Sequence, residues 1–250
     1  MNKRLTAMVT IKNDIVVQSF SYNNYLPIGT PEIVCENLSR WGADEIIVSS
    51  IDISKKKLSP NLRLLESISR SKVSTPLIYS GGIGNTQDAM DAINAGADRV
   101  VIDSVLSEKK IDLINKITSK IGAQALIISM PVVEVENKLF RYDYMSKSNV
   151  EFKKITKILK CINFSEILLI DKNNEGGDNF NIKLVNMILE YLKCELLVFG
   201  GISNNRTIKE LIKYNEINSI VIGNSLNYKE IQISNLKSKF KKNFRKVNYE

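Results

Sequence analysis

The sequence contains no histidine. A Ser-His-Asp triad, a Cys-His dyad and a histidine-ligated metal centre are therefore excluded, which removes the commonest designs of hydrolases and metalloenzymes. Cysteine is scarce too: Cys35, Cys161 and Cys194 lie far apart and never in a C-x-x-C spacing. They indicate neither a disulfide framework nor a zinc ribbon, and they favour a reducing, cytoplasmic compartment. We expect no metal and no cofactor.

Long apolar runs are also missing. No segment approaches the roughly 20 residues that span a bilayer, so no membrane association is expected. Positive charges outnumber negative ones, with 35 Lys and Arg against 27 Asp and Glu. Much of the excess lies in residues 55–57 and in a basic C-terminal tail over residues 236–250. This excess of positive charge comes without a recognisable base-stacking platform, so we expect no nucleic-acid binding.

Short β-branched runs alternate with segments of helical period, which is typical of a parallel sheet wrapped by helices. Strands are expected near residues 4–10, 45–51, 76–80, 99–103, 124–130, 166–171, 195–199 and 218–223. Helices are expected near residues 31–41, 61–71, 86–95, 111–121, 150–161, 182–192 and 206–214. Eight strands with intervening helices in 250 residues predict an α/β fold, a single (β/α)8 (TIM) barrel domain over residues 1–250.

The sequence also repeats itself. Gly81-Gly82 returns as Gly200-Gly201 at an offset of 119, residues 45–48 return as 166–169 at 121, and residues 101–104 return as 221–224 at 120. Three matches in register indicate two half-barrels, about 1–122 and 123–235. Chance similarity among apolar strands is the alternative, but paired glycines do not arise from apolar composition.

Each glycine pair follows an apolar strand and precedes a helix. Residues without Cβ let the backbone approach an oxyanion, and the helix N-terminus adds free N–H donors. The turn after the next strand supplies further polar groups in each half. We therefore predict two phosphate cradles, one for each end of a small phosphorylated ligand, formed by Gly81, Gly82 and Ser104 and by Gly200, Gly201, Asn224 and Ser225. The plainer alternative is that the glycines only form tight turns.

Several segments carry a family pattern in unbroken order: KRLTAMV (3–9), GADEIIV (42–48), SGGI (80–83), AGADRV (95–100), SEILL (165–169) and the second glycine pair. They resemble the cyclase subunit of imidazole glycerol phosphate synthase, over about residues 3–230. The resemblance implies a barrel of two half-barrel repeats that receives ammonia from a separate glutaminase subunit. In that family, ammonia enters at the N-terminal face and reacts at the C-terminal face with a substrate that carries two phosphates.

The catalytic positions depart from the family. Its members use two aspartates, at the ends of the first and fifth strands, and the matching residues here are Thr10 and Pro131. Neither side chain exchanges a proton near neutral pH. Asp52 and Asp171 end other strands and are weaker candidates for part of that work. The sequence therefore assigns no catalytic residue.

Three further positions depart from the family at this end. Gln18 replaces a lysine that can contact the substrate, Asp103 replaces a neutral amide beside the first cradle, and the sixth loop, residues 172–181, lacks an Asp-Gly-Thr pattern. A carboxylate beside a cradle repels phosphate unless it is protonated or turned away.

The opposite end of the barrel keeps the family pattern. The resemblance implies that a ring of four charges gates the ammonia entrance, and Arg4, Glu45, Arg99 and Glu166 occupy its positions. Asp98 matches a residue that grips the glutaminase in the family. Alternating charges can satisfy one another at a narrow opening, although four charged strand starts can also be a plain solvated face.

We therefore predict a synthase subunit that docks a glutaminase and conducts ammonia through the barrel, without the cyclase chemistry. The family resemblance extends to a branch in which a third enzyme places the nitrogen on another acceptor, for example an acetamido sugar for surface polysaccharide. The alternative is an active cyclase of histidine biosynthesis that uses acids such as Asp52 and Asp171. A silent regulatory or structural barrel is the third possibility.

Overall fold

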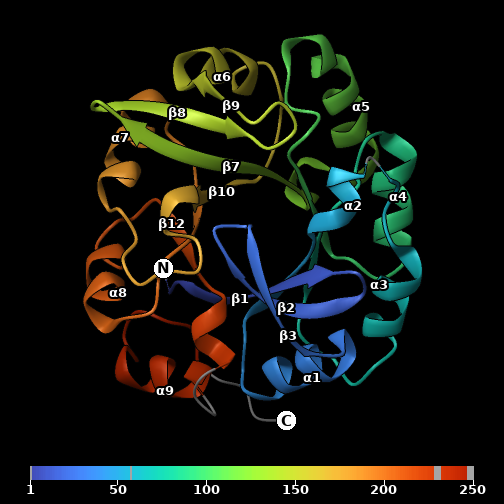
Figure 1. Ribbon diagram of the computed structural model, residues 1–250, viewed down its shortest axis with the longest axis vertical. Coiled ribbons are helices and arrows are strands. Elements are labelled where there is room, and N and C mark those ends of the chain that lie inside the picture. Colours follow the sequence, from blue (N-terminus) through green and yellow to red (C-terminus); the bar gives the residue numbers. More distant parts are fainter. Residues whose placement is uncertain (1, 57, 228–231, 247–250) are drawn as a thin grey trace.

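The computed structural model describes residues 2–56, 58–227 and 232–246. Within these residues, eight parallel strands close into a barrel, because β10 pairs with β7 as well as with β11 (Figure 1). The barrel strands are β1 (Arg4–Lys12), β4 (Glu45–Ser50), β5 (Leu77–Ser80), β6 (Arg99–Ile102), β7 (Leu126–Val135), β10 (Glu166–Asp171), β11 (Leu196–Phe199) and β12 (Ile217–Ile222). The predicted (β/α)8 barrel is confirmed, although β1 and β7 extend beyond their predicted ends.

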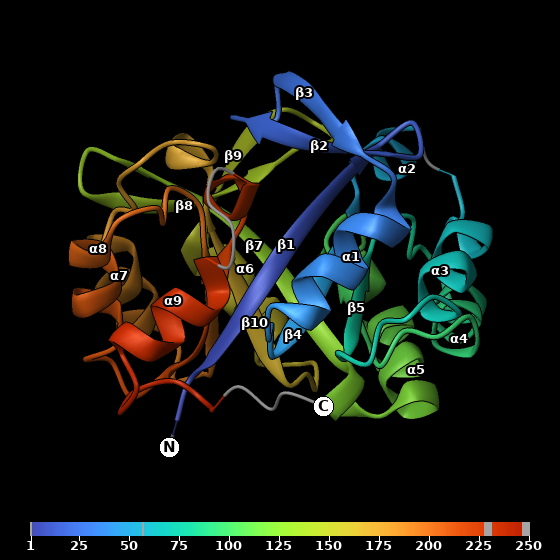
Figure 2. The same ribbon diagram turned by 90° about the horizontal axis from the view of Figure 1, so that it is seen from below.

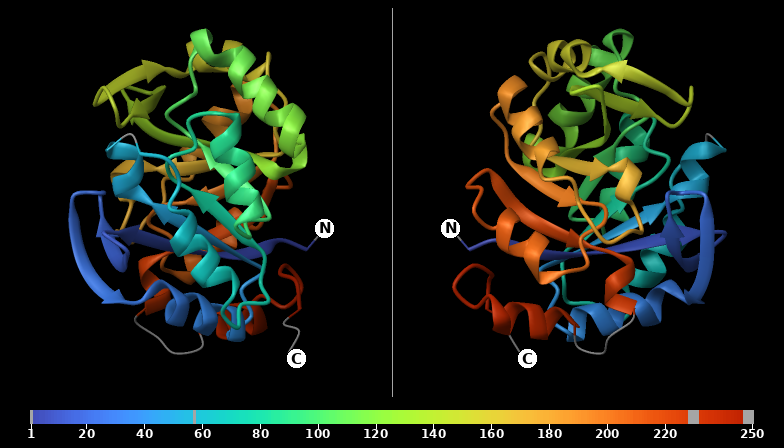
Figure 3. Two further views of the ribbon diagram at one scale, coloured as in Figure 1. Left: turned by 90° about the vertical axis from the view of Figure 1, so that its right-hand side faces the viewer. Right: turned by 60° about the vertical axis from the view of Figure 1, so that its left-hand side comes forward.

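The helices surround the barrel (Figures 1 and 3). They are α1 (Pro31–Arg40), α2 (Ile51–Lys55), α3 (Leu62–Ser69), α4 (Thr86–Asn94), α5 (Ile111–Ile121), α6 (Phe152–Leu159), α7 (Lys183–Tyr191), α8 (Asn205–Leu211) and α9 (Gln232–Lys239). Asn85 caps α4 by accepting a hydrogen bond from the backbone N–H of Asp88, and Asn204 caps α8 in the same way. The two caps follow the two glycine pairs, so the repeat extends to these helix starts.

Two β-hairpins interrupt the regular alternation. One follows β1 and contains β2 (Ile15–Phe20) and β3 (Asn24–Gly29); the other follows β7 and contains β8 (Lys138–Asp143) and β9 (Ser148–Glu151). Residues 13–14 and 136–137 link β1 to β2 and β7 to β8, and all four have positive φ, as in type I′ turns. Figures 2 and 3 place both hairpins at one end of the barrel, opposite the N-terminus.

Two apolar layers hold the barrel together. One fills the space between strands and helices, and the other, which includes Met8, Ile47 and Leu168, fills the barrel interior. Among the described residues, no helix is long and apolar enough to cross a membrane.

The C-terminal segment packs against the barrel. Phe240 and Phe244 join the outer core, and the buried Lys237 forms an ion pair with Asp44 at 2.7 Å. Much of the predicted basic tail therefore belongs to the folded body. Residues 247–250 of that tail, and Lys57 of the basic run at 55–57, lie outside the described residues.

Candidate functional site

The four predicted ring residues meet at the N-terminal mouth of the barrel. Glu45 Oε1 lies 3.1 Å from Arg4 Nη1 and 3.3 Å from Arg99 Nη1, and both guanidinium groups also contact the carboxylate of Glu166. Cations and anions alternate, so the four side chains form a closed charge ring. Their side chains are only 4–14% exposed, in a depression of about 510 Å³ on this face.

The two carboxyl groups of the charge ring differ in their electrostatics. Burial raises the pKa of Glu45 in spite of the two arginines. Burial also acts to raise the pKa of Glu166, but Arg4, Arg99 and Asn218 outweigh it and lower that pKa. The difference follows from the contacts, because both arginines share one oxygen of Glu45 whereas each contacts its own oxygen of Glu166.

Contacts around the charge ring hold Arg99 in place. Its guanidinium donates to Ser165 Oγ at 2.7 Å and to the carbonyl of Gln124 at 3.2 Å. Asp98, the predicted glutaminase contact, is exposed beside Arg99, and its Oδ2 accepts a hydrogen bond from the backbone N–H of Leu77 at 2.8 Å. The N-terminal face therefore presents the charge ring and Asp98 together.

Polar side chains continue from the charge ring into the barrel. Thr6 Oγ1 contacts Glu45 Oε2 at 3.3 Å and Ser219 Oγ at 2.6 Å. Ile47 and Leu168 lie two residues beyond the ring carboxylates, about 7 Å along their strands, and already line the pocket at the opposite end. Roughly one layer of apolar side chains therefore separates the charge ring from this pocket.

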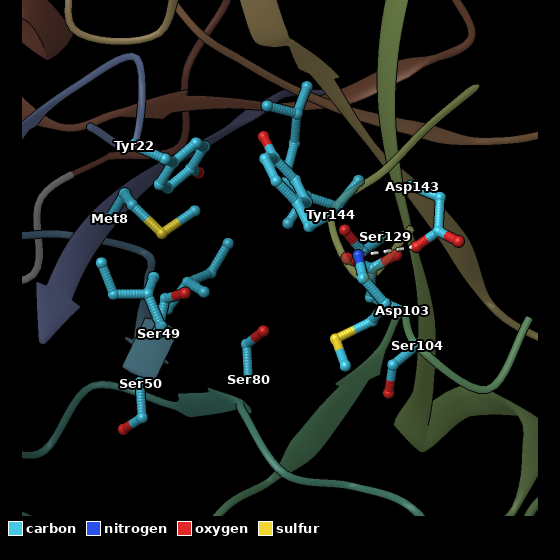
Figure 4. A pocket seen from close by; sticks show the side chains of 15 residues that line it. Met8, Tyr22, Ser49, Ser50, Ser80, Asp103, Ser104, Ser129, Asp143 and Tyr144 are labelled. Atoms are coloured by element: carbon cyan, nitrogen blue, oxygen red, sulfur yellow. Dashed lines mark hydrogen bonds between the residues drawn. The ribbon is translucent and has the colours of Figure 1, made fainter. Parts of the chain in front are cut away.

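The central pocket lies at the C-terminal mouth of the barrel and encloses about 100 Å³ (Figure 4). Tyr22, between β2 and β3, and Tyr144, between β8 and β9, meet there edge-on with ring centroids 5.5 Å apart. Burial raises the pKa of both tyrosines well above the ordinary value, so both stay neutral. Each half-barrel thus contributes one hairpin tyrosine to the pocket.

Asp103 lines the central pocket and not the first glycine turn. Arg141, whose side chain is 4% exposed, contacts both the carboxylate and the carbonyl of Asp103. Burial raises the pKa of Asp103, and Arg141 acts in the opposite direction. Sequence reasoning missed Arg141 and both tyrosines because they lie on the hairpins, where no glycine marks the turns.

The first glycine cavity, about 500 Å³, brings together Gly82 and Ser104 of the first predicted cradle. Asp88 also lines it, and its Oδ2 accepts hydrogen bonds from the backbone N–H of Gly84 at 2.9 Å and from Asn85 Nδ2 at 2.8 Å. Gly81 instead packs against β4, where an added Cβ would lie 2.7 Å from the carbonyl oxygen of Ser50. The carboxylate of Asp88 thus already occupies two donors just before α4, where the sequence predicts a phosphate cradle.

The second glycine cavity, about 20 Å³, brings together Gly201, Asn224 and Ser225. This space suits about one water molecule. The Asn224 side chain is committed to β2, since its Nδ2 donates to the carbonyl of Ser19 at 2.6 Å and its Oδ1 accepts from the Ser19 N–H at 3.1 Å. Gly200 packs against the backbone of Asp171. Phosphate binding at either cavity stays a prediction.

The two positions of the family aspartates do not line the central pocket. Thr10 is buried, in register with Ser49. Pro131 lies between Ile128, the last residue of β7 that pairs with β6, and Val132, the first that pairs with β8. A residue without an N–H donor is tolerated there because the strand is changing partners.

The weaker acid candidates also lie outside the lining of the central pocket. Asp52 contacts Lys56 at 3.2 Å. Asp171 is buried and accepts hydrogen bonds from Asn174 Nδ2 and the backbone N–H of Asn181, both at 2.8 Å, so it holds the sixth loop. Burial raises the pKa of Asp171. Among the described residues, no cluster of three or more carboxyl or thiol groups is suited to hold a metal ion.

Comparison with known proteins decides the family. The model of the histidine biosynthesis protein family matches residues 4–232, most of the chain. The chain belongs to this family. Its divergence within the family is large, as the individual relatives show.

One similar protein, from Vibrio vulnificus (strain YJ016), is provisionally named imidazole glycerol phosphate synthase subunit hisF2; it is 29% identical over 202 residues, 80% of this chain and 74% of its own. Imidazole glycerol phosphate synthase subunit HisF of Flavobacterium johnsoniae is 24% identical over 96% of each chain. The HisF subunit of Hydrogenobaculum sp. (strain Y04AAS1) is 25% identical, also over 96% of each. The chain is therefore a divergent, HisF-like member of the family.

Glu175 offers a test of the packing behind the second glycine cavity. It is 3% exposed, and its Oε2 accepts hydrogen bonds from Ser19 Oγ at 3.1 Å and from the Tyr22 N–H at 2.9 Å. Burial raises the pKa of Glu175 although these hydrogen bonds oppose it. The folded state therefore favours the protonated form of Glu175. The stability that this preference contributes is complete below the ordinary glutamate pKa and is lost as the pH rises through the raised pKa.

We expect the thermal unfolding midpoint of the wild type to rise relative to that of Glu175→Gln as the pH falls from about 7 to about 5. Thermal unfolding followed by circular dichroism measures the two pH profiles. Glu190→Gln, at an exposed site on α7, is the control and should run parallel to the wild type. Parallel profiles for all three proteins would contradict the raised pKa.

Proposed function

We propose that this chain is the synthase-type subunit of a glutamine amidotransferase complex. It docks a glutaminase subunit on the N-terminal barrel face and conducts ammonia through the barrel to an acceptor beyond the C-terminal face. The observation that carries the proposal is the closed charge ring, which lies about one apolar layer below the central pocket. The names of the relatives, which are subunits of a synthase, support a partner chain.

A sealed path has a chemical purpose. Ammonia released into water near neutral pH is mostly protonated and no longer acts as a nucleophile. A dry interior bounded by Met8, Ile47 and Leu168 keeps the nitrogen neutral until it reaches the acceptor. The charge ring excludes bulk water from the entrance while its members satisfy one another.

The cyclase reaction of the family is not part of the proposed function, because threonine and proline occupy its two catalytic positions. The acceptor is then another molecule, for example an acetamido sugar that a third enzyme presents, and the glycine cavities are candidates for a small phosphorylated ligand. An active cyclase in histidine biosynthesis is the second candidate. The glycine turns favour it, because both pairs keep positive φ angles in the two halves.

Asp98 variants test the dock. We expect Asp98→Ala to weaken a one-to-one complex with the glutaminase subunit about tenfold, which is the loss of one charged hydrogen bond. Asp98→Asn keeps an acceptor for the Leu77 N–H and separates this loss from local unfolding. Asp112→Ala, exposed on α5, is the matched control. Titration calorimetry measures the affinities, and failure of the wild type to form any complex would refute the dock.

Arg4 variants test the conduit. In the reconstituted complex with its acceptor enzyme, Arg4→Ala leaves the ring carboxylates with one fewer partner and loosens the entrance. We expect the glutamine-driven rate of nitrogen transfer to fall while the ammonium-driven rate is largely kept. Equal loss of both rates would refute the conduit and favour a silent barrel.

A further inference from the structure

We propose that the central pocket binds a small uncharged ligand rich in hydroxyl groups and discriminates against anions. The inference deepens the proposed function, on which it rests for the role of the pocket as the acceptor end of the barrel. Binding itself involves the barrel alone. The hydrogen-bonding groups, the shape and the charge of the pocket each lead to this ligand class.

One wall of the central pocket is a row of serines. Ser49, Ser80 and Ser129 stand on β4, β5 and β7, and Ser104 follows β6 at the rim. Within the described part of the chain, no hydrogen bond engages any of these four hydroxyl groups. Figure 4 shows Ser49 and Ser80 on the opposite side of the cavity from the two tyrosines. Hydroxyl groups inside a pocket need partners, and here a ligand or water must supply them.

Apolar side chains also line the pocket. Met8, Leu168 and Ile170 are among them, together with Tyr22. A ligand that fills this space therefore needs polar groups for the serines and a C–H surface for these side chains. A small polyol or a monosaccharide ring has both.

The charges around the pocket disfavour an anion. Among the described residues, no Lys or Arg side chain lines it, whereas Asp103 and Asp143 do. Arg141 contacts Oδ1 of Asp103, and within the described residues no donor reaches Oδ2. Asp143 is held by its own turn, by the Met145 N–H at 2.9 Å and Ser146 Oγ at 2.7 Å. A phosphate group would lose its hydration here without meeting a cation.

A neutral hydroxyl group, in contrast, finds complementary atoms. The open oxygen of Asp103 accepts a hydrogen bond, and the serines both donate and accept. The pocket therefore presents several serine hydroxyl groups without protein partners and one carboxylate oxygen that only accepts hydrogen bonds.

Matched pairs of probes test the inference on the full chain without glutaminase. Saturation-transfer NMR compares glycerol with glycerol 3-phosphate, and glucose with glucose 6-phosphate. We expect the neutral member of each pair to bind about tenfold more tightly, as one unpaired charge predicts. Ser80→Ala and Ser129→Ala should each weaken neutral binding about fivefold, the loss of one hydrogen bond, while Ser119→Ala on the exposed face of α5 changes nothing.

A charge added at the rim provides the second test. Met145 is 39% exposed and borders both the central pocket and the first glycine cavity. Met145→Lys should shift the preference toward the phosphorylated members. A wild-type preference for the phosphorylated probes, or no binding of either neutral probe, would overturn the inference. These results do not depend on glutaminase docking, so the two proposals fail separately.

Discussion

Glu166→Ala is expected to lower the free energy of unfolding by about 3–5 kcal/mol. The substitution leaves two nearly buried guanidinium groups to share the single carboxylate of Glu45, so one positive charge is left unpaired in the barrel mouth. The hydrogen bond from Asn218 to Glu166, 3.1 Å long, is lost as well. Urea denaturation of wild type and variant measures the difference.

Glu66→Ala is the matched control for this prediction. Glu66, on α3, pairs with Arg70 just after that helix, but both side chains are substantially exposed, at 43% and 79%. Its removal should cost no more than about 0.5 kcal/mol. If Glu166→Ala cost as little as the control, the charge ring would be an ordinary solvated face and not a closed structure.

No imidazole glycerol phosphate is expected above the buffer background when the purified chain receives ammonium salt and the two-phosphate substrate of the family. Thr10 and Pro131 supply no proton-transfer group, and the second glycine cavity, at about 20 Å³, holds about one water. Restoring aspartates at both positions should not restore turnover, because the space beside Asn224 stays filled. Product formation, measured by chromatography, is the readout.

The Flavobacterium johnsoniae HisF subunit is the natural positive control for that assay. Turnover by this chain that disappears in Asp52→Asn or Asp171→Asn would contradict the prediction and promote the active-cyclase alternative. Asp171→Asn alone is ambiguous, since Asp171 also holds the sixth loop. A folded variant, judged by circular dichroism, is therefore a condition of the test.

The barrel was predictable because its signals are local and repeated. Apolar strand runs recur at a fixed offset, and the glycine pairs with Asn85 and Asn204 mark helix starts in both halves. The hairpins were not predictable, since their turns are Asn13-Asp14 and Glu136-Asn137 and lack the glycine that usually marks a type I′ turn.

The candidate site could be predicted at one end of the barrel and not at the other. The charge-ring residues stand at strand starts, where the alternation of the strand fixes the direction of each side chain. The central pocket depends on how two hairpins approach each other, and therefore on contacts such as Tyr22 with Tyr144, which join residues far apart in sequence. Asp103 is an example. The sequence places it at the end of a strand, but Arg141 on β8 sets the direction of its side chain.

Both cations of the charge ring are arginines, and this choice limits how the entrance can open. A guanidinium group keeps its proton throughout the physiological range, so the cationic half of the ring cannot be discharged by a passing base or by a fall in proton concentration. Opening must be mechanical: a guanidinium has to swing aside and exchange its carboxylates for other acceptors. Arg99 already holds two such acceptors, Ser165 Oγ and the carbonyl of Gln124. On the cationic side, traffic through this barrel would accordingly follow side-chain motion, and the acidity of the surroundings would act only through the carboxylates, of which Glu45 has the raised pKa.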